Sequence, residues 1–279
     1  MLQKRVAAIH DISCFGKCSL TVALPILSAA GIETPVIPTA VLSTHTGGFS
    51  GYTFRDLTDD IMPVAKHWKK ENITVDAVYS GYLGSKEQIG LVMDAIKEIK
   101  NDNTIVVVDP VMADNGKLYG GFAPDFPMEM RKLCETADII TPNITEATFM
   151  LGMPYKDGPY DEDYINAVLS GLSKMTSGSI VLTGVFFDDK SIGAVCFDGK
   201  ETSYAFSERI PTSYHGTGDV FSSTLVSAIM NKKSLKEATQ VAVDFTCACI
   251  KHTYENYPYM KYGVNFEAQL PYLMKMLGL

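Results

Sequence analysis

Thr104-Ile105-Val106-Val107-Val108-Asp109-Pro110 is the strongest strand signal in the chain, a continuous β-branched run that ends in an acid and a proline. A run of this kind is typical of a strand buried on both faces of a parallel sheet. Two later segments repeat the pattern of an apolar strand followed by a small polar residue, at residues 139–143 (IITPN) and 179–184 (SIVLTG). In open α/β sheets the ligand crevice lies at the carboxyl ends of the strands, so we expect a binding site at this edge.

Strand-like and helix-like segments alternate on both sides of this run. Expected strands before it are residues 5–10, 35–42 and 76–84, and expected helices are residues 19–30, 54–70, 85–100, 127–134, 144–151 and 161–175. Ser19 is a candidate N-cap of the first helix, and Gly31 is its expected stop. The alternation predicts an α/β fold with a central, mostly parallel sheet and helices on both faces.

The pattern changes after residue 193. Residues 193–210 form short alternating segments around Asp198-Gly199, a hairpin turn signal that predicts a few antiparallel strands at the edge of the sheet. The last third of the chain is helical, with expected helices at residues 220–230, 235–254 and 266–277. Because no repeat or linker stands out and 279 residues suit one α/β unit, we expect residues 1–279 to form a single domain.

Composition and charge limit the classes of partner. Hydrophobic residues make up 46% and charged residues 20%, as in proteins with a large core. Lys plus Arg is 24 and Asp plus Glu is 32, which gives 24 − 32 = −8, so neither nucleic acid nor an anionic membrane is an expected partner.

The cysteines and the apolar segments indicate the compartment. The six cysteines have no CxxC spacing and no adjacent histidine, so we interpret them as reduced thiols, with the Cys247-Ala248-Cys249 pair as helix core. No apolar run approaches ~18 residues, and the first residues lead into a strand and not into a signal-peptide core. We therefore expect a cytoplasmic protein.

Gly216-Thr217-Gly218-Asp219 directly precedes a helix-period run. The two glycines allow a tight turn that presents free N–H groups at a helix start, where the partial positive charge favours a phosphoryl group. Asp219, in the first turn, is placed to accept a proton from a hydroxyl. The pattern indicates phosphoryl transfer to an alcohol; the alternative is an ordinary glycine-rich loop with an acidic helix start.

Two other polar segments follow strands. Residues 43–52 (STHTGGFSGY) gather hydroxyls, one imidazole and three glycines, as expected of a mobile loop that closes over a polar ligand, or of an exposed turn with no such role. Gly16-Lys17 resembles the end of a P-loop, but position 11 holds Asp and position 18 holds Cys, so we reject that motif. We interpret Lys17 as a solvated side chain.

Taken together, the motifs resemble the ribokinase-like superfamily of small-molecule kinases and, within it, the pyridoxal (pyridoxamine, pyridoxine) kinase family. The resemblance covers nearly the whole chain and rests on residues 109–114 (DPVMAD), residues 140–143 (ITPN) with Glu146, residues 182–184 (LTG) and residues 216–219 (GTGD). The sister hydroxymethylpyrimidine phosphate kinases often carry Cys where this chain has Asp219, which favours the vitamin B6 branch. The loop after His45 departs from the family pattern, with Gly47-Gly48-Phe49 where bulkier residues are common.

The resemblance implies a role for each matching residue. Asp219 would be the general base, and the amides of Gly216, Thr217 and Gly218 would form an anion hole. Asp109 and Glu146, with Thr141 and Thr183, would hold the metal ions on the nucleotide phosphates. Residues that would bind ATP are Asp109, Asp114, Tyr119, Thr141, Asn143, Glu146, Thr183, Gly184, Thr217 and Gly218, and residues that would bind the vitamer are Ser13, His45, Thr46, Tyr82 and Asp219.

The resemblance therefore implies ATP-dependent phosphorylation of the 5′-hydroxymethyl group of a B6 vitamer, with Mg²⁺ and K⁺, in a homodimer. A hydroxymethylpyrimidine (phosphate) kinase is the alternative enzyme, a sugar kinase of the same superfamily is a weaker one, and a non-catalytic vitamer-binding protein is the alternative from another class.

Structural alternatives remain for single residues. Asp109 could be a turn former before Pro110, and Asn143 could only cap the following helix. His45 could be a satisfied loop histidine, and Tyr82 could be packing alone.

Overall fold

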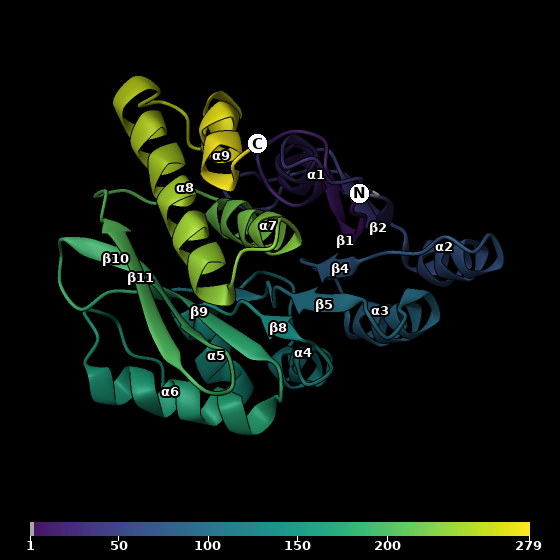
Figure 1. Cartoon of the computed structure of the whole chain (residues 1–279), viewed down its shortest axis with the longest axis horizontal. Coiled ribbons are helices and arrows are strands. Elements are labelled where there is room, and N and C mark those ends of the chain that lie inside the picture. The colour runs from purple at the N-terminus through teal and green to yellow at the C-terminus, as the bar shows by residue number, and fades with distance from the viewer. Residues whose placement is uncertain (1–2) are drawn as a thin grey trace.

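A nine-stranded sheet forms the centre of the computed structural model, which describes residues 3–279 (Figure 1). Its strand order is β11-β10-β9-β8-β5-β4-β1-β2-β3. The parallel strands are β1 (Val6–Ser13), β2 (Val36–Leu42), β4 (Ala77–Ser80), β5 (Ile105–Val108), β8 (Ile139–Ile140) and β9 (Ser179–Val185), and the antiparallel strands are β3 (Phe54–Asp56), β10 (Ser191–Phe197) and β11 (Thr202–Glu208). The predicted mostly parallel sheet with antiparallel edges is confirmed.

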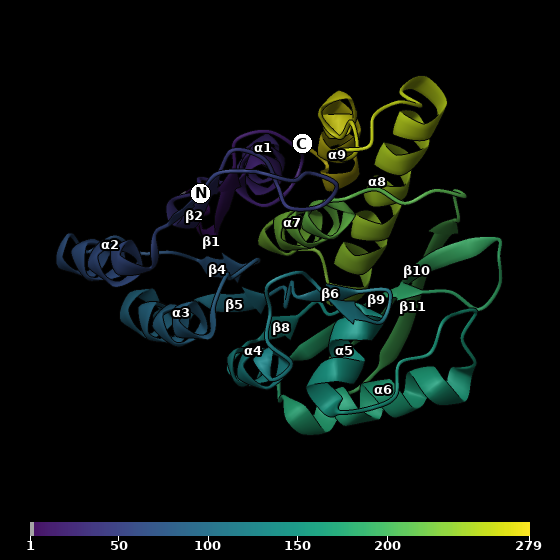
Figure 2. The same ribbon diagram turned by 180° about the vertical axis from the view of Figure 1, so that it is seen from behind.

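Helices cover both faces of this sheet, as Figures 1 and 2 show. One face carries α1 (Leu20–Ala29), α7 (Thr217–Met230), α8 (Leu235–Asn256), a short 3-10 turn η1 (Glu267–Gln269) and α9 (Leu270–Leu277). The other face carries α2 (Thr58–Lys70), α3 (Lys86–Ile99), α4 (Phe126–Cys134), α5 (Ile144–Leu151) and α6 (Glu162–Met175). Two buried apolar clusters result, one on each face.

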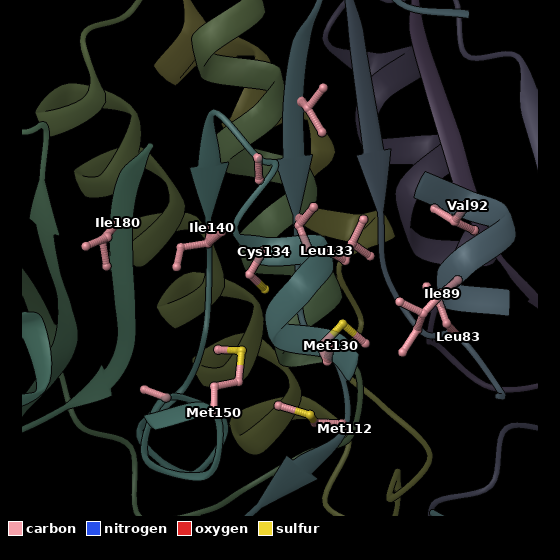
Figure 3. Packing of buried hydrophobic residues seen from close by; sticks show 14 of the residues in the cluster. Leu83, Ile89, Val92, Met112, Met130, Leu133, Cys134, Ile140, Met150 and Ile180 are labelled. Carbon is pink, nitrogen blue, oxygen red and sulfur yellow. The ribbon is translucent and has the colours of Figure 1, made fainter. Parts of the chain in front are cut away.

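The cluster beneath the sheet joins helices to strand side chains (Figure 3). Met130 and Leu133 of α4 pack there with Ile140 of β8 and Ile180 of β9, and all four are buried. A fully buried aliphatic side chain contributes ~1.5–3 kcal/mol to the free energy of folding. The strand β5 is buried on both faces of the sheet, and this explains its continuous run of β-branched residues. This packing fixes the strand ends that carry the polar residues.

The chain order places a switch point next to β1. The chain passes from β1 to its neighbour β2, and then returns to β4 on the other side of β1. In doubly wound sheets the ligand crevice lies outside the carboxyl ends of the strands at such a point. The carboxyl ends of β1, β2, β4, β5, β8 and β9 lie at one edge, so the fold itself directs the site there.

Two expectations for element boundaries are wrong. Residues 54–56 do not begin the helix but form β3, paired with β2, and the helix starts only at Thr58, whose amide donates to Asp56 at 2.7 Å. The expected strand at 76–84 ends at Ser80. A small hairpin, β6 (Ala113–Asp114) and β7 (Lys117–Leu118), was not expected from the sequence.

Ser19 occupies the N-cap position of α1, as expected, but its side chain does not cap the helix. Its φ is 57°, and its hydroxyl donates to the carboxylate of Asp11 and not to the first turn of the helix. Lys17 is not a solvated side chain either, since its ammonium pairs with Glu267 and lies 5.3 Å from the ring centre of Phe266. Both side chains therefore tie the turn between β1 and α1 to other residues of the fold.

Within residues 3–279, no helix has the length and apolar character needed to cross a bilayer.

Candidate active site

A cavity of about 1200 Å³ opens at the carboxyl edge of the sheet. The structure brings every candidate site residue to its wall: Ser13, His45, Thr46, Tyr82, Asp109, Asp114, Tyr119, Thr141, Asn143, Glu146, Thr183, Gly184, Gly216, Thr217, Gly218 and Asp219. These residues come from six strand ends, the β6–β7 hairpin and the start of α7. With a volume of about 1200 Å³, the cavity is large enough for two ligands side by side.

The glycine turn begins α7. Gly216 is the residue before the helix, with φ of 76°, and a Cβ built there would lie 1.7 Å from the carbonyl oxygen of Lys17. Only glycine fits this left-handed position against the β1–α1 turn. The first amides of α7 have no partner within the helix and lie at its cavity end. Such a helix N-terminus is a site for an anion.

Asp219 lies in the first turn of α7 and is buried at the cavity wall. Burial, with smaller contributions from the charges of Asp109 and Asp11, raises its pKa from the ordinary value to about 8, although the amide of Ser19 donates to the carboxylate and opposes the shift. A carboxylate with this pKa is a stronger base than an exposed aspartate. The side chain is neither turned into apolar packing nor remote from the cleft.

Asp109 follows β5 and is buried beside Asp219. Burial raises its pKa to about 7, while the neighbouring hydroxyls of Ser222 and Thr141 oppose the shift. These two hydroxyls are also hydrogen-bonded to each other at 3.0 Å, so they form one polar network beside the carboxylate. Asp109 is therefore more than a turn former before Pro110.

Glu146 and Asn143 begin α5 with a reciprocal cap. The Asn143 side chain accepts from the Glu146 amide, and the Asn143 amide donates to Glu146 Oε2 at 2.9 Å. Glu146 Oε1 accepts from the Met112 amide at 3.1 Å, and Asn143 Nδ2 donates to the Ala113 carbonyl at 2.8 Å. The capping role is thus real, and the same bonds hold the β6–β7 hairpin over the cavity.

The carboxylates at this end suit a hard cation. Burial, and then the charge of Asp109, raises the pKa of Glu146 well above its ordinary value. No ion pair with Asp109, Glu146 or Asp219 is found among residues 3–279, so their charge is not balanced by the protein. In the described part of the chain no group of three or more His, Cys, Asp or Glu side chains forms a metal cage. Mg²⁺ is usually held by one or two carboxylates together with substrate phosphates, and this donor set fits it.

The far end of the cavity contains the polar groups that follow β1 and β2. Ser13 donates from its hydroxyl to Asp11 Oδ2 at 3.1 Å, so its oxygen lone pairs remain free as acceptors. His45 is buried, and its Nε2 lies 3.1 Å from the Tyr262 carbonyl, which can only accept. The neutral ring therefore carries its proton on Nε2 and leaves Nδ1 as an acceptor.

Burial shifts the pKa values of His45 and Tyr82 at this end of the cavity in opposite directions. Burial lowers the pKa of His45, the bond to Tyr262 opposes this, and the charge of His215 lowers it again. Burial raises the pKa of Tyr82 to about 12, with smaller contributions from Asp11 and Tyr52. Tyr82 also lies 5.6 Å from the Phe122 ring, centre to centre, so it both packs and faces the cavity.

Sequence reasoning missed several wall residues. Asp11 entered the sequence interpretation only as a mismatch to the P-loop motif, yet it is buried, burial raises its pKa, and it accepts from Ser13 and Ser19. His215 was also missed, because it reaches the cavity from the connection between β11 and α7. Tyr262, in a segment after α8, was missed as the residue whose carbonyl holds His45. For His215 the available signal was its position directly before the glycine turn.

Comparisons with known proteins agree with this geometry. Residues 26–262 match the family model described as phosphomethylpyrimidine kinase. The chain is similar to a pyridoxine kinase of Bacillus subtilis, 32% identical over 69% of each chain. It is also similar to a pyridoxal kinase of Dictyostelium discoideum, 28% identical over 91% of this chain and 88% of that one. Among solved structures, a Bacteroides thetaiotaomicron protein provisionally named a phosphomethylpyrimidine kinase, in a crystal form with pyridoxal, is 37% identical, with a TM-score of 0.90 over 97% of this chain and 96% of that one.

Proposed function

Since the chain belongs to the phosphomethylpyrimidine kinase family, we propose that it transfers the γ-phosphoryl group of ATP to the 5′-hydroxymethyl group of pyridoxal, pyridoxamine or pyridoxine. The observation that carries this assignment is the position of Asp219, a buried carboxylate in the glycine turn at the start of α7, in a cavity that Ser13, His45 and Tyr82 also line. Kinase relatives that act on B6 vitamers support the choice of alcohol.

Asp219 takes the proton of the hydroxymethyl group as the phosphoryl group is transferred. Its pKa of about 8 makes it a strong enough base near neutral pH, and the Ser19 amide orients the carboxylate. No covalent intermediate on the protein is needed, because the alcohol attacks directly.

The amides at Gly216, Thr217 and Gly218 stabilise negative charge on the transferred group, helped by the dipole of α7. Asp109 and Glu146, with the hydroxyls of Thr141 and Thr183, would hold Mg²⁺ on the phosphates and K⁺ beside them. When bound, Mg²⁺ neutralises phosphate charge and aligns the group for in-line transfer.

The remaining wall residues divide between the two substrates. Asn143, Gly184, Asp114 and Tyr119 would contact the nucleotide, since they surround the end of the cavity that contains Asp109. Ser13, His45, Thr46 and Tyr82 would hold the pyridine ring and its substituents. The acceptors left by Ser13 and His45 suit donor groups on the ring.

We further propose that residues 1–279 act as one kinase domain, in a cytoplasmic homodimer. The six cysteines are free thiols, which supports a reducing compartment. The homodimer rests on family analogy, and light scattering coupled to size-exclusion chromatography tests it.

A second candidate is the phosphorylation of hydroxymethylpyrimidine or its phosphate. The matched family model favours it. Asp219 favours the B6 alcohols, and the three buried carboxylates Asp109, Glu146 and Asp219 favour an enzyme over a non-catalytic vitamer-binding protein.

A panel of alcohols separates these functions. With Mg·ATP, ADP release is measured with pyridoxal, pyridoxine, pyridoxamine, hydroxymethylpyrimidine, hydroxymethylpyrimidine phosphate and ribose. The proposed function predicts the largest kcat/KM with a B6 vitamer. A larger value with a pyrimidine would establish the second candidate, and pyridoxal binding without ADP release would establish a binding protein.

A further inference from the structure

His215 is the residue directly before the glycine turn, at the mouth of the cavity. Its side chain is exposed, and within residues 3–279 neither ring nitrogen has a hydrogen-bond partner. An imidazole carries at least one N–H in either protonation state, so His215 presents a free donor beside the amides of α7. This donor makes no hydrogen bond within the described part of the fold, and it lines the same cavity as the glycine turn, where a phosphoryl group would bind.

On one side His215 touches the 43–52 loop. A Cβ built at Gly47 would lie 2.6 Å from His215 Nδ1 and 2.7 Å from its Cε1. The backbone of Gly47 is not in the left-handed region, so close approach of the imidazole is what requires glycine there. The ring centres of His215 and His45 are 5.5 Å apart, which extends the contact to the alcohol end.

His215 also lines the same cavity as the β6–β7 hairpin. Asp114 lies in this hairpin and at the cavity wall. Burial raises the pKa of Asp114, and the positive charge of His215 opposes that shift. One imidazole therefore contacts the loop expected over the vitamer and acts electrostatically on the hairpin expected over the nucleotide.

We propose that His215 couples the two substrate sites: it seats the 43–52 loop on the glycine turn and donates a hydrogen bond to the phosphoryl group that arrives there. This inference rests on the proposed function, since it requires a nucleotide phosphate and a vitamer in the same cavity. A bound nucleotide fixes the imidazole, and the fixed imidazole holds Gly47 in the position that closes over the vitamer. Vitamer and nucleotide then strengthen each other's binding.

The test measures the binding of pyridoxal with and without Mg²⁺ and a β,γ-imido analogue of ATP. Wild-type protein should bind pyridoxal at least ~5-fold more tightly in the presence of the analogue. In His215→Ala this ratio should fall to near one, whereas His215→Gln, which keeps a side-chain N–H and most of the volume, should retain most of it. Exposed His67 of α2 provides the matched control, because His67→Ala should keep the full ratio.

A double-mutant cycle tests the contact itself. Gly47→Ala should weaken pyridoxal binding ~10-fold in the wild-type background, since overpacking a close contact typically costs enough for such a change. In the His215→Ala background the same substitution should have no further effect, because the imidazole that blocks the methyl group is gone. Gly90→Ala, on an exposed part of α3 with no neighbour within 4 Å, controls for the glycine-to-alanine change.

Three results would overturn the proposal: wild-type protein without coupling, a His215→Ala variant with wild-type coupling, or a Gly47→Ala effect of equal size in both backgrounds. Melting curves establish that each variant is folded. Since the readout is binding, it is independent of turnover. Coupled binding without phosphoryl transfer would refute the proposed kinase function and leave the role of His215 standing.

Discussion

Replacing Asp219 by Asn removes the proposed base and leaves the shape of the buried side chain almost unchanged. A positioned general base contributes ~10²–10⁴-fold to the rate. Because the pKa of Asp219 is about 8, only about one tenth of the molecules carry the base form at pH 7. The loss should therefore be ~100–10⁴-fold at pH 9.5, and about tenfold smaller when both proteins are compared at pH 7.

The assay follows product formation in quenched samples from pH 6 to pH 10, with both substrates well below their KM values so that the rate reports the free enzyme. The base form of Asp219 is lost as the pH falls through its pKa, so the wild-type rate should rise about tenfold per pH unit and level off near pH 8. Asp219→Asn should give a low rate without this limb, while its affinity for the nucleotide analogue persists. Asp102→Asn, at an exposed loop residue, is the matched control. An Asp219→Asn rate within tenfold of wild type at pH 9.5 would refute the assignment.

Three further predictions follow from neighbouring groups. Asp11→Asn removes a negative charge that raises the pKa of Asp219, so the acid limb of the pH–rate profile should move to lower pH; an unchanged limb would contradict this coupling. The pKa of buried Asp219 is raised, so in the ligand-free protein its contribution to stability is present below the unfolded-state pKa and is lost as the pH rises toward about 8, by about 1.4 kcal/mol per pH unit. The melting temperature should accordingly fall from pH 6 to pH 8, less steeply in Asp219→Asn than in wild type, and equal slopes would contradict the prediction. Lys17→Ala removes the ion pair with Glu267, and this pair braces the segment whose Tyr262 carbonyl orients His45. Because such a pair is worth about 1 kcal/mol, KM for pyridoxal should rise about fivefold while kcat changes little. A fall in kcat alone would exclude this role for Lys17.

The parts of the fold that follow from local chemistry were predictable. The run at 105–108 can only be a doubly buried strand, and Asn143 with Glu146 caps α5 as the Asn-x-x-Glu spacing indicates. The short strand β3 was not predictable from helix-period spacing, because its three residues are exposed and gain their structure only by pairing with β2. Ser19 likewise has the right residue type for an N-cap, but a buried acid elsewhere in the fold takes its hydroxyl.

The site residues likewise divide into those that the sequence predicts and those that it does not. Residues at strand ends and in the glycine turn were recognisable because parallel strands end at one edge and a helix start binds anions, and all of them line the cavity. Asp11 and Tyr262 were not recognisable, since their roles depend on contacts between segments far apart in the chain, whereas the signal for His215 was its position directly before the glycine turn. Tyr262 acts through a backbone carbonyl, which no side-chain pattern can reveal.

The most direct test of the central claim is a single-turnover experiment with pyridoxal and Mg·ATP, in which the product is identified by mass and by the position of its phosphate. The account predicts pyridoxal 5′-phosphate, formed in equal amount with ADP by the wild-type protein and, at pH 9.5, at least ~100-fold more slowly by Asp219→Asn. Phosphate on any other atom, ADP without phosphorylated pyridoxal, or equal rates from the two proteins would contradict it.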